Sequence, residues 1–169
     1  MPYHFRPLTP DDARTMLGWR YPPPLDLYDA DLDFMDENVE SVLVPEFHYH
    51  TVLDGAGRMI GFCCFGEDAQ VTGGDYGREA IDVGLSLDPA LIGQGLGRDF
   101  LAAILALGRD LFAPSCFRAT VVDFNRRSRR LFQRAGFLET QRFSPPNRPH
   151  LSFVVLERDE GTAVDPGAI

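Results

Sequence analysis

The chain has 169 residues, 44% of them hydrophobic, which is enough to bury the core of one globular domain. Its formal net charge of -9 disfavours binding to nucleic-acid phosphates and suits a neutral or cationic partner better. No stretch approaches the roughly 20 apolar residues of a membrane-spanning helix, and the N-terminal sequence lacks the order of a secretory signal. We therefore expect a cytoplasmic protein, monomeric or homodimeric, that binds neither nucleic acid nor membranes.

The residue types present exclude several kinds of chemistry. All 16 basic residues are arginines, and the absence of lysine excludes a Walker-type phosphate lysine and a Schiff-base mechanism. The cysteines at 63, 64 and 116 are too few and too unevenly spaced for a zinc site or a disulfide framework. His48 and His50 share one face of a predicted strand but have no third ligand nearby, so we expect no metal.

Hydrophobic periodicity and turn residues predict alternating strands and helices. In chain order they are a strand at 3–8, helices at 10–19 and 29–42, a strand hairpin at 46–53 and 58–65, a strand at 79–88, a helix after the glycines at 93–97, a strand at 117–122, a helix at 125–135 and a strand at 151–157. The proline-rich segment 21–28 is predicted to be an ordered loop over a pocket. This order indicates an α+β (mixed α/β) fold with a central sheet and helices on its faces. We expect one domain at 1–158 and a flexible tail at 159–169.

Two motifs flank the strand at 117–122. In the first, Gly93-Gln94-Gly95-Leu96-Gly97-Arg98 joins a strand to a helix, where backbone N–H groups can point at an anion. A dinucleotide fingerprint fails because Arg98 takes the place of its last glycine, and a glycine turn without a ligand fits this segment equally well on its own. The second motif begins a helix with Asn125 and Ser128, continues through Leu131 and Phe132, and ends in Gly-Phe at 136–137.

Together these motifs, within residues 79–137, resemble the GNAT superfamily of N-acetyltransferases. The resemblance implies a mostly antiparallel twisted sheet of six to seven strands, with two strands splayed at a site for acetyl-CoA, the cosubstrate. By the resemblance, the backbone of Leu85, Ser86 and Leu87 pairs with the pantetheine arm, and the loop Gly93 to Arg98 holds the pyrophosphate. It also implies that Asn125, Ser128 and Phe132 contact the cofactor.

The sequence departs from the family pattern at two positions. Ile92 stands where the family usually has Arg or Gln, but backbone amides hold most of the anion, so we expect binding to persist. Phe132 stands where a tyrosine often protonates the departing thiolate, and a phenyl ring cannot donate a proton. Arginines at 126, 127, 129, 130 and 134 either serve the 3′-phosphate of coenzyme A or form a solvated helix face.

Candidate catalytic residues follow from the need to deprotonate an amine before it attacks a thioester. Asp82, in an otherwise apolar strand, is our first candidate for the proton acceptor; it could instead face solvent or pair with an arginine. Glu67 and Asp68, after the preceding strand, are the second choices. A backbone N–H near Leu85 is expected to stabilise the oxyanion.

Aromatic residues near the N-terminus are candidates for the acceptor pocket. Trp19, Tyr21, Asp26 and Tyr28 could give a cation aromatic faces and a charge partner, although simple packing of this loop explains them equally well. The sequence thus predicts transfer of an acetyl group from acetyl-CoA to a primary amine of a small molecule or peptide. The alternatives are a catalytically idle acyl-CoA sensor, suggested by Phe132, and an aminoglycoside-type antibiotic acetyltransferase.

Overall fold

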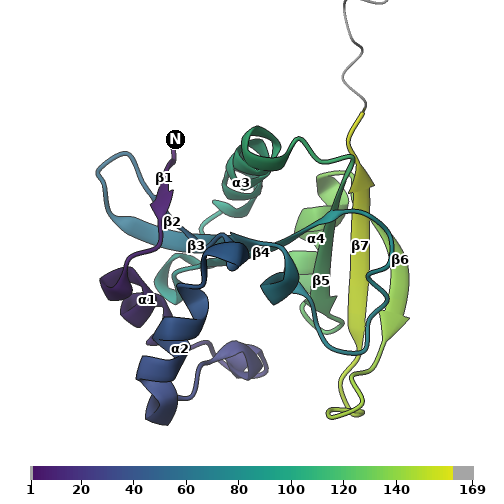
Figure 1. Ribbon diagram of the computed structural model, residues 1–169, viewed down its shortest axis with the longest axis horizontal. Helices are drawn as coiled ribbons and strands as arrows, with labels where there is room; N and C mark the ends of the chain where they lie inside the picture. The colour runs from purple at the N-terminus through teal and green to yellow at the C-terminus, as the bar shows by residue number, and fades with distance from the viewer. Residues whose placement is uncertain (1, 162–169) are drawn as a thin grey trace, which may run out of the picture.

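The protein folds around one seven-stranded sheet, with strand order β1-β2-β3-β4-β5-β7-β6. The computed structural model describes residues 2–161. Its strands are β1 (His4–Pro7), β2 (His50–Leu53), β3 (Met59–Phe65), β4 (Ile81–Leu87), β5 (Cys116–Val122), β6 (Leu138–Phe143) and β7 (Phe153–Asp159), and its helices are α1 (Pro10–Leu17), α2 (Met35–Val42), α3 (Gly97–Phe112) and α4 (Arg126–Arg134). The sheet is therefore mixed and its order follows the chain except at the end, where β7 lies between β5 and β6 (Figure 1).

Strand pairing in the sheet is interrupted at its centre, between β4 and β5. All neighbouring strands are antiparallel except β4 and β5, which run parallel and pair only at Ile81 with Phe117 and at Asp82 with Arg118. From residue 83 onward β4 pairs with β3 alone. The sheet thus divides into a β1–β4 half and a β5–β7 half that are joined at one point.

Two apolar cores lie on opposite faces of the β1–β4 half, covered by α3 on one side and by α1 and α2 on the other (Figure 1). Successive side chains of β3 point to opposite faces, so Cys63 joins the core under α3 while Phe62 packs with α1 and α2. The core under α3 continues into the other half through Phe117 and Leu156. Within the described residues, no helix is long and apolar enough to cross a membrane.

Local signals explain where the helices begin. Thr9 and Asp12 form a reciprocal capping box at α1, with Pro10 in the first turn. Asn125 caps α4 by accepting a hydrogen bond from the backbone N–H of Ser128 at 3.2 Å. Both starting points agree with the sequence prediction.

Three predicted boundaries need correction, and one strand was not predicted. The helix expected at 29–42 is helical only as a short 3-10 turn and α2, and the strand expected at 46–53 begins only at His50. The turn before that strand is a 3-10 helix that ends with His48 in the left-handed conformation (φ 49°). The edge strand β6 was missed because its mostly exposed, polar sequence lacks an alternating apolar pattern. β7 extends to Asp159, and most of the predicted tail, 162–169, lies outside the described residues.

Gly61 in β3 provides a test of this packing. A Cβ there would lie 2.5 Å from the Ser86 carbonyl oxygen and 2.6 Å from the Phe100 ring, so Gly61→Ala requires backbone of β4 or a core ring to move. We expect it to lower the free energy of unfolding by about 1–3 kcal/mol, measured by urea denaturation. Gly55→Ala, whose Cβ would meet only Pro2 at 3.9 Å, is the matched control and should change stability little. Equal effects of the two changes would contradict the packing described.

Candidate functional site

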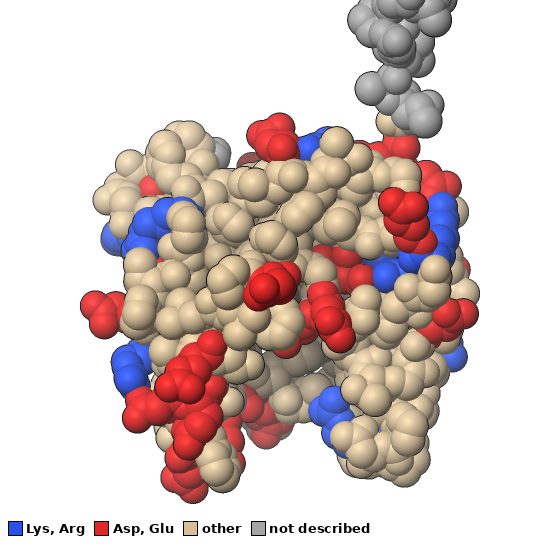
Figure 2. All heavy atoms as spheres, in the orientation of Figure 1, with Lys and Arg blue, Asp and Glu red and all other residues tan. Residues whose placement is uncertain are grey.

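A cavity of about 1450 Å³ lies where β4 and β5 separate. Its walls include Leu85 of β4 and Val121 of β5, together with the glycine loop before α3 and the start of α4. Figure 2 shows the molecular surface hollowed between the two halves of the sheet, with acidic side chains gathered on the side of α2. The splayed strands that the resemblance implied are therefore present, and this cavity lies between them.

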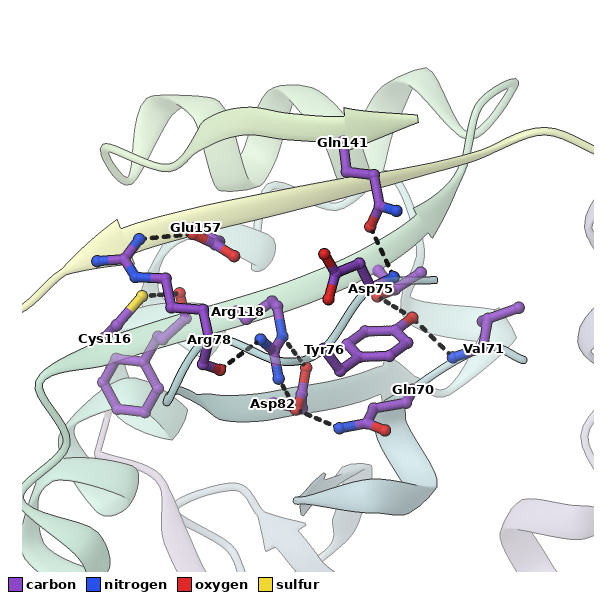
Figure 3. A network of polar contacts seen from close by, with 12 residues as sticks. Gln70, Val71, Asp75, Tyr76, Arg78, Asp82, Cys116, Arg118, Gln141 and Glu157 are labelled. Atoms are coloured by element: carbon purple, nitrogen blue, oxygen red, sulfur yellow. Dashed lines mark hydrogen bonds and ion pairs between the residues drawn. The ribbon is translucent and has the colours of Figure 1, made fainter. Parts of the chain in front are cut away.

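A buried ion pair lies next to this cavity, one residue before the first lining residues of β4 and β5. Arg118 of β5 donates to both oxygens of Asp82 of β4, with Nε–Oδ1 at 2.6 Å and Nη2–Oδ2 at 2.7 Å, and both side chains are almost fully buried. Gln70 donates a further hydrogen bond to Asp82 Oδ2 at 2.9 Å (Figure 3). Arg118 also donates to the Arg78 carbonyl oxygen and stacks on the ring of Tyr76. Hydrogen bonding to Asp82 raises the pKa of Arg118 further, so its charge is retained.

These contacts change the interpretation of Asp82. The bidentate pairing with Arg118 and the Gln70 contact occupy both carboxylate oxygens, and Asp82 is not among the residues that line the cavity. The alternative reading of the sequence, a pair with an arginine, is the one that the structure shows. We therefore assign Asp82 a structural role at the junction of β4 and β5.

The glycine loop has the features of an anion cradle. Gly93 and Gly95 adopt positive φ angles of 85° and 80°, and a Cβ at either would meet nothing within 4 Å, so the space above the loop is open. Leu96 provides no side-chain cap for α3. The first backbone N–H groups of α3 are therefore available to a ligand. Arg98, at the start of that helix, also lines the cavity. This donor set fits a pyrophosphate.

The basic cluster of α4 is divided by the structure. Arg127, Arg130 and Arg134 line the cavity, whereas Arg129 pairs with Asp123 at 2.7 Å. A phosphate-binding role thus suits the first three, and Arg129 instead joins α4 to the end of β5.

The proline-rich segment is an ordered strap across the open strands. The Tyr21 hydroxyl lies 2.7 Å from Ser86 Oγ and donates to the Leu87 carbonyl oxygen of β4 at 3.0 Å. The Tyr28 hydroxyl accepts a hydrogen bond from the Val122 N–H of β5 at 3.3 Å. One segment therefore contacts both separated strands, as the prediction of a loop over a pocket requires.

Most of the predicted site residues line this one cavity. Those that do are Leu85, Ser86, Leu87, Gly93, Gly95, Leu96, Gly97, Arg98, Asn125, Ser128 and Phe132 from the predicted cofactor site, and Trp19, Tyr21 and Tyr28 from the predicted acceptor pocket. Those that do not are Asp82, Glu67, Gln94 and Asp26. Phe132 is 3% exposed and packs edge-to-face on Phe137, 5.1 Å between ring centres.

Sequence reasoning missed several polar residues near the junction. Tyr49 lies just before β2 and contacts Asp68, and Tyr76 links the Val71 N–H to the Thr120 hydroxyl. Nothing in the local pattern distinguishes these residues from ordinary strand and loop residues. Their roles arise from contacts between segments distant in the chain.

Comparisons with known proteins agree with this geometry. Residues 3–138 match the family model described as "Acetyltransferase (GNAT) domain". The chain belongs to the GNAT acetyltransferase family. No curated protein gives a significant sequence match.

Solved structures of GNAT proteins share the fold of the chain. Spermidine N-acetyltransferase from Vibrio cholerae, in complex with CoA and spermine, is 16% identical with a TM-score of 0.72, covering 93% of this chain and 95% of that one. Aminoglycoside acetyltransferase AAC(6')-Ib in complex with coenzyme A is 15% identical with a TM-score of 0.73, covering 94% and 95%. A putative phosphinothricin N-acetyltransferase is 16% identical with a TM-score of 0.70, covering 95% and 100%. Because the sequence identities are this low, the structural similarity establishes the fold alone.

The junction predicts a large effect on stability. Asp82→Asn leaves the buried Arg118 charge without its partner, and we expect the free energy of unfolding to fall by roughly 3 kcal/mol in urea denaturation. Asp36→Asn, which breaks an exposed ion pair with Arg14, is the control and should cost at most about 1 kcal/mol. A stable Asp82→Asn protein that has lost acetyl transfer would instead restore Asp82 as the proton acceptor.

Proposed function

We propose that this GNAT protein is an N-acetyltransferase that transfers the acetyl group of acetyl-CoA to a primary amine of a small molecule or peptide. The observation that carries the proposal is the edge of β4 beyond Asp82, which pairs with no strand on the β5 side and is followed, after one 3-10 turn, by an open, uncapped glycine loop. An extended pantetheine arm can pair with such a strand edge, and a pyrophosphate with such a loop.

The residues that hold the donor follow from their positions in the cavity. The backbone of Leu85 to Leu87 receives the pantetheine arm, and the N–H groups from Gly93 to Arg98 receive the pyrophosphate. Arg127 and Arg130 of α4 are placed for the remaining phosphate charge. Acetyl-CoA supplies an acyl thioester that an amine can attack directly, so no covalent enzyme intermediate is needed.

Three tasks remain for the protein. It must orient the amine toward the carbonyl carbon, accept the proton of its ammonium form, and stabilise the charge that develops on the carbonyl oxygen. We assign the last task to a backbone N–H of the open β4 edge near Leu85. Phe132 cannot supply a proton to the leaving sulfur, so that proton comes from the attacking nitrogen or from water.

Phe132 also favours a second candidate function. A chain that binds acetyl-CoA without turning it over would act as an acyl-CoA sensor. Binding and thiol release must therefore be measured separately on the same protein.

Calorimetric titration with acetyl-CoA and coenzyme A tests the donor site. We expect micromolar binding to the wild type and at least about a tenfold loss in Gly95→Trp, because the indole fills the space above the loop. Gly57→Trp is the matched control: Gly57 also has a positive φ, 79°, and open space above it, but lies in the β2–β3 turn. Its affinity should match the wild type.

The possible outcomes separate the alternatives. A wild type that binds neither ligand would refute the proposed function. Equal losses in both tryptophan variants would point to strain and not to the phosphate loop. Binding without thiol release across a range of amines would favour the sensor.

A further inference from the structure

The charged residues that line the cavity are unequally distributed. Among the described residues, Asp68 is the only carboxylate in the lining, and every other charged side chain there is an arginine. Asp68 belongs to the 3-10 helix η4 (Glu67–Ala69), which connects β3 toward β4. Its neighbour Glu67 is exposed, as Asp68 is, but lies outside the lining. Asp68 is therefore the carboxylate of the cavity wall that a cation can reach.

Asp68 is held in place from the other side of β3. The Tyr49 hydroxyl donates a hydrogen bond to Asp68 Oδ2 at 2.6 Å. Burial, with the nearby Cys64 and Asp68, raises the pKa of Tyr49 well above its usual range, so the phenol remains a donor. The other oxygen of Asp68 has no hydrogen bond from the described residues, and Asp68 is exposed and lines the cavity.

This carboxylate lies beside the point where β4 leaves β5. Cys64 is the register partner of Gly84, and a Cβ at Gly84 would lie 2.7 Å from Cys64 Sγ and 3.4 Å from Ala69 Cβ. η4 thus packs directly on β4 one residue before Leu85, where the donor carbonyl is proposed to bind. Absence of a side chain at Gly84 is what lets Cys64 and η4 pack this closely on β4.

An aromatic wall adjoins the carboxylate. Phe62 lies between Trp19, at 6.0 Å between ring centres, and Tyr49, at 5.9 Å. These three rings line the cavity together with apolar residues of α1 such as Met16. They offer a large apolar surface and ring faces that attract a cation.

We propose that Asp68, oriented by Tyr49, binds the ammonium group of the acceptor and takes its proton, and that the adjoining rings select a primary amine with one positive charge on an apolar or aromatic body. This inference rests on the proposed acetyltransferase function. It gives the catalytic task that was first assigned to Asp82 to a different carboxylate. Tyr49 acts as a positioning residue.

The proton and electron balance is complete without any further reactant. The ammonium gives one proton to Asp68, and the neutral nitrogen forms the C–N bond as the C–S bond breaks, with the electron pair leaving on sulfur. The nitrogen then loses a second proton, through water, to that sulfur and retains the third as the amide N–H. Asp68 returns its proton to solvent. The products are an N-acetyl amine, coenzyme A thiol and one proton.

The adjoining rings favour a broad apolar body over a polyamine chain. Trp19, Phe62 and Tyr49 line the cavity, and an aromatic or bulky apolar body covers more of that ring surface than a thin polymethylene chain does. The arginines of the glycine loop and α4 do not decide this preference, because they are assigned to the phosphates of the donor. We therefore expect an acceptor class different from the spermine bound in the Vibrio cholerae structure.

Steady-state thiol release with acetyl-CoA and 2-phenylethylamine tests the role of Asp68. We expect Asp68→Asn to lower kcat/KM at least about 100-fold at pH 7. The ratio of wild-type to Asp68→Asn kcat/KM should fall as the pH rises, because the amine then loses its proton in solution. A purely structural defect would leave this ratio independent of pH. Tyr49→Phe should lower kcat/KM about tenfold by removing one charge-assisted hydrogen bond.

Two other carboxylates provide comparisons. Glu46→Gln removes an exposed negative charge outside the cavity, from a residue whose backbone adjoins Gly66 just before η4, and should leave kcat/KM unchanged. Glu67→Gln tests the neighbour that the sequence suggested together with Asp68. Loss of activity in Glu67→Gln with retention in Asp68→Asn would overturn the proposal.

A second substrate tests the selectivity. We expect kcat/KM for 2-phenylethylamine to exceed that for spermidine at least about tenfold, the range in which apolar pockets discriminate between substrates. Spermidine as the better substrate, or acetylation of neither amine by a protein that binds acetyl-CoA, would overturn the acceptor assignment and leave the donor site intact.

A wild type that does not bind acetyl-CoA would instead refute the proposed function itself. Calorimetry on Asp68→Asn must show unchanged acetyl-CoA affinity, and a loss there would contradict an acceptor-side role.

Discussion

The buried ion pair between Asp82 and Arg118 fixes the point from which the site is built. It joins β4 to β5 at the last residue pair where the two strands still lie side by side, and Gln70 and Tyr76 pack the connecting loop against it. Two charges in a nearly water-free position are costly unless each satisfies the other, so their separation is strongly resisted. The strands can diverge beyond this point without the halves of the sheet coming apart.

Everything proposed for the site lies along β4 outward from that junction. η4 and Tyr49 stand at its inner end, the open strand edge follows, and the glycine loop lies where the strand passes into α3. The strap from Tyr21 to Tyr28 crosses the gap and contacts both strands. A single strand thus orders an acidic aromatic region, a strand edge and a basic region in sequence, which matches an acceptor, a thioester arm and phosphates.

Local sequence patterns were sufficient to predict the position of those elements whose ends carry capping residues or glycines. The start of α4 at its Asn125 cap and the turn before α3 were predicted from such signals, and two spaced motifs indicated the family. The sequence could not predict which partner Asp82 would find, because Arg118 is 36 residues away and enters through strand pairing. β6 was not predicted from the sequence, because an exposed edge strand needs no apolar periodicity. The sequence offered Asp68 only as a second choice beside Glu67, and it gave no sign of Tyr49, because the hydrogen bond between Tyr49 and Asp68 joins residues that are 19 positions apart.

The cations that line the cavity are guanidinium groups throughout, since the chain has no lysine. A guanidinium stays protonated at any physiological pH, and its nitrogens have no free lone pair with which to attack an acyl carbon. An ammonium side chain in the same position would lose its proton often enough to become a competing acceptor. In the proposed acetyl transfer, the arginine lining would therefore leave the bound donor no side-chain amine to acylate.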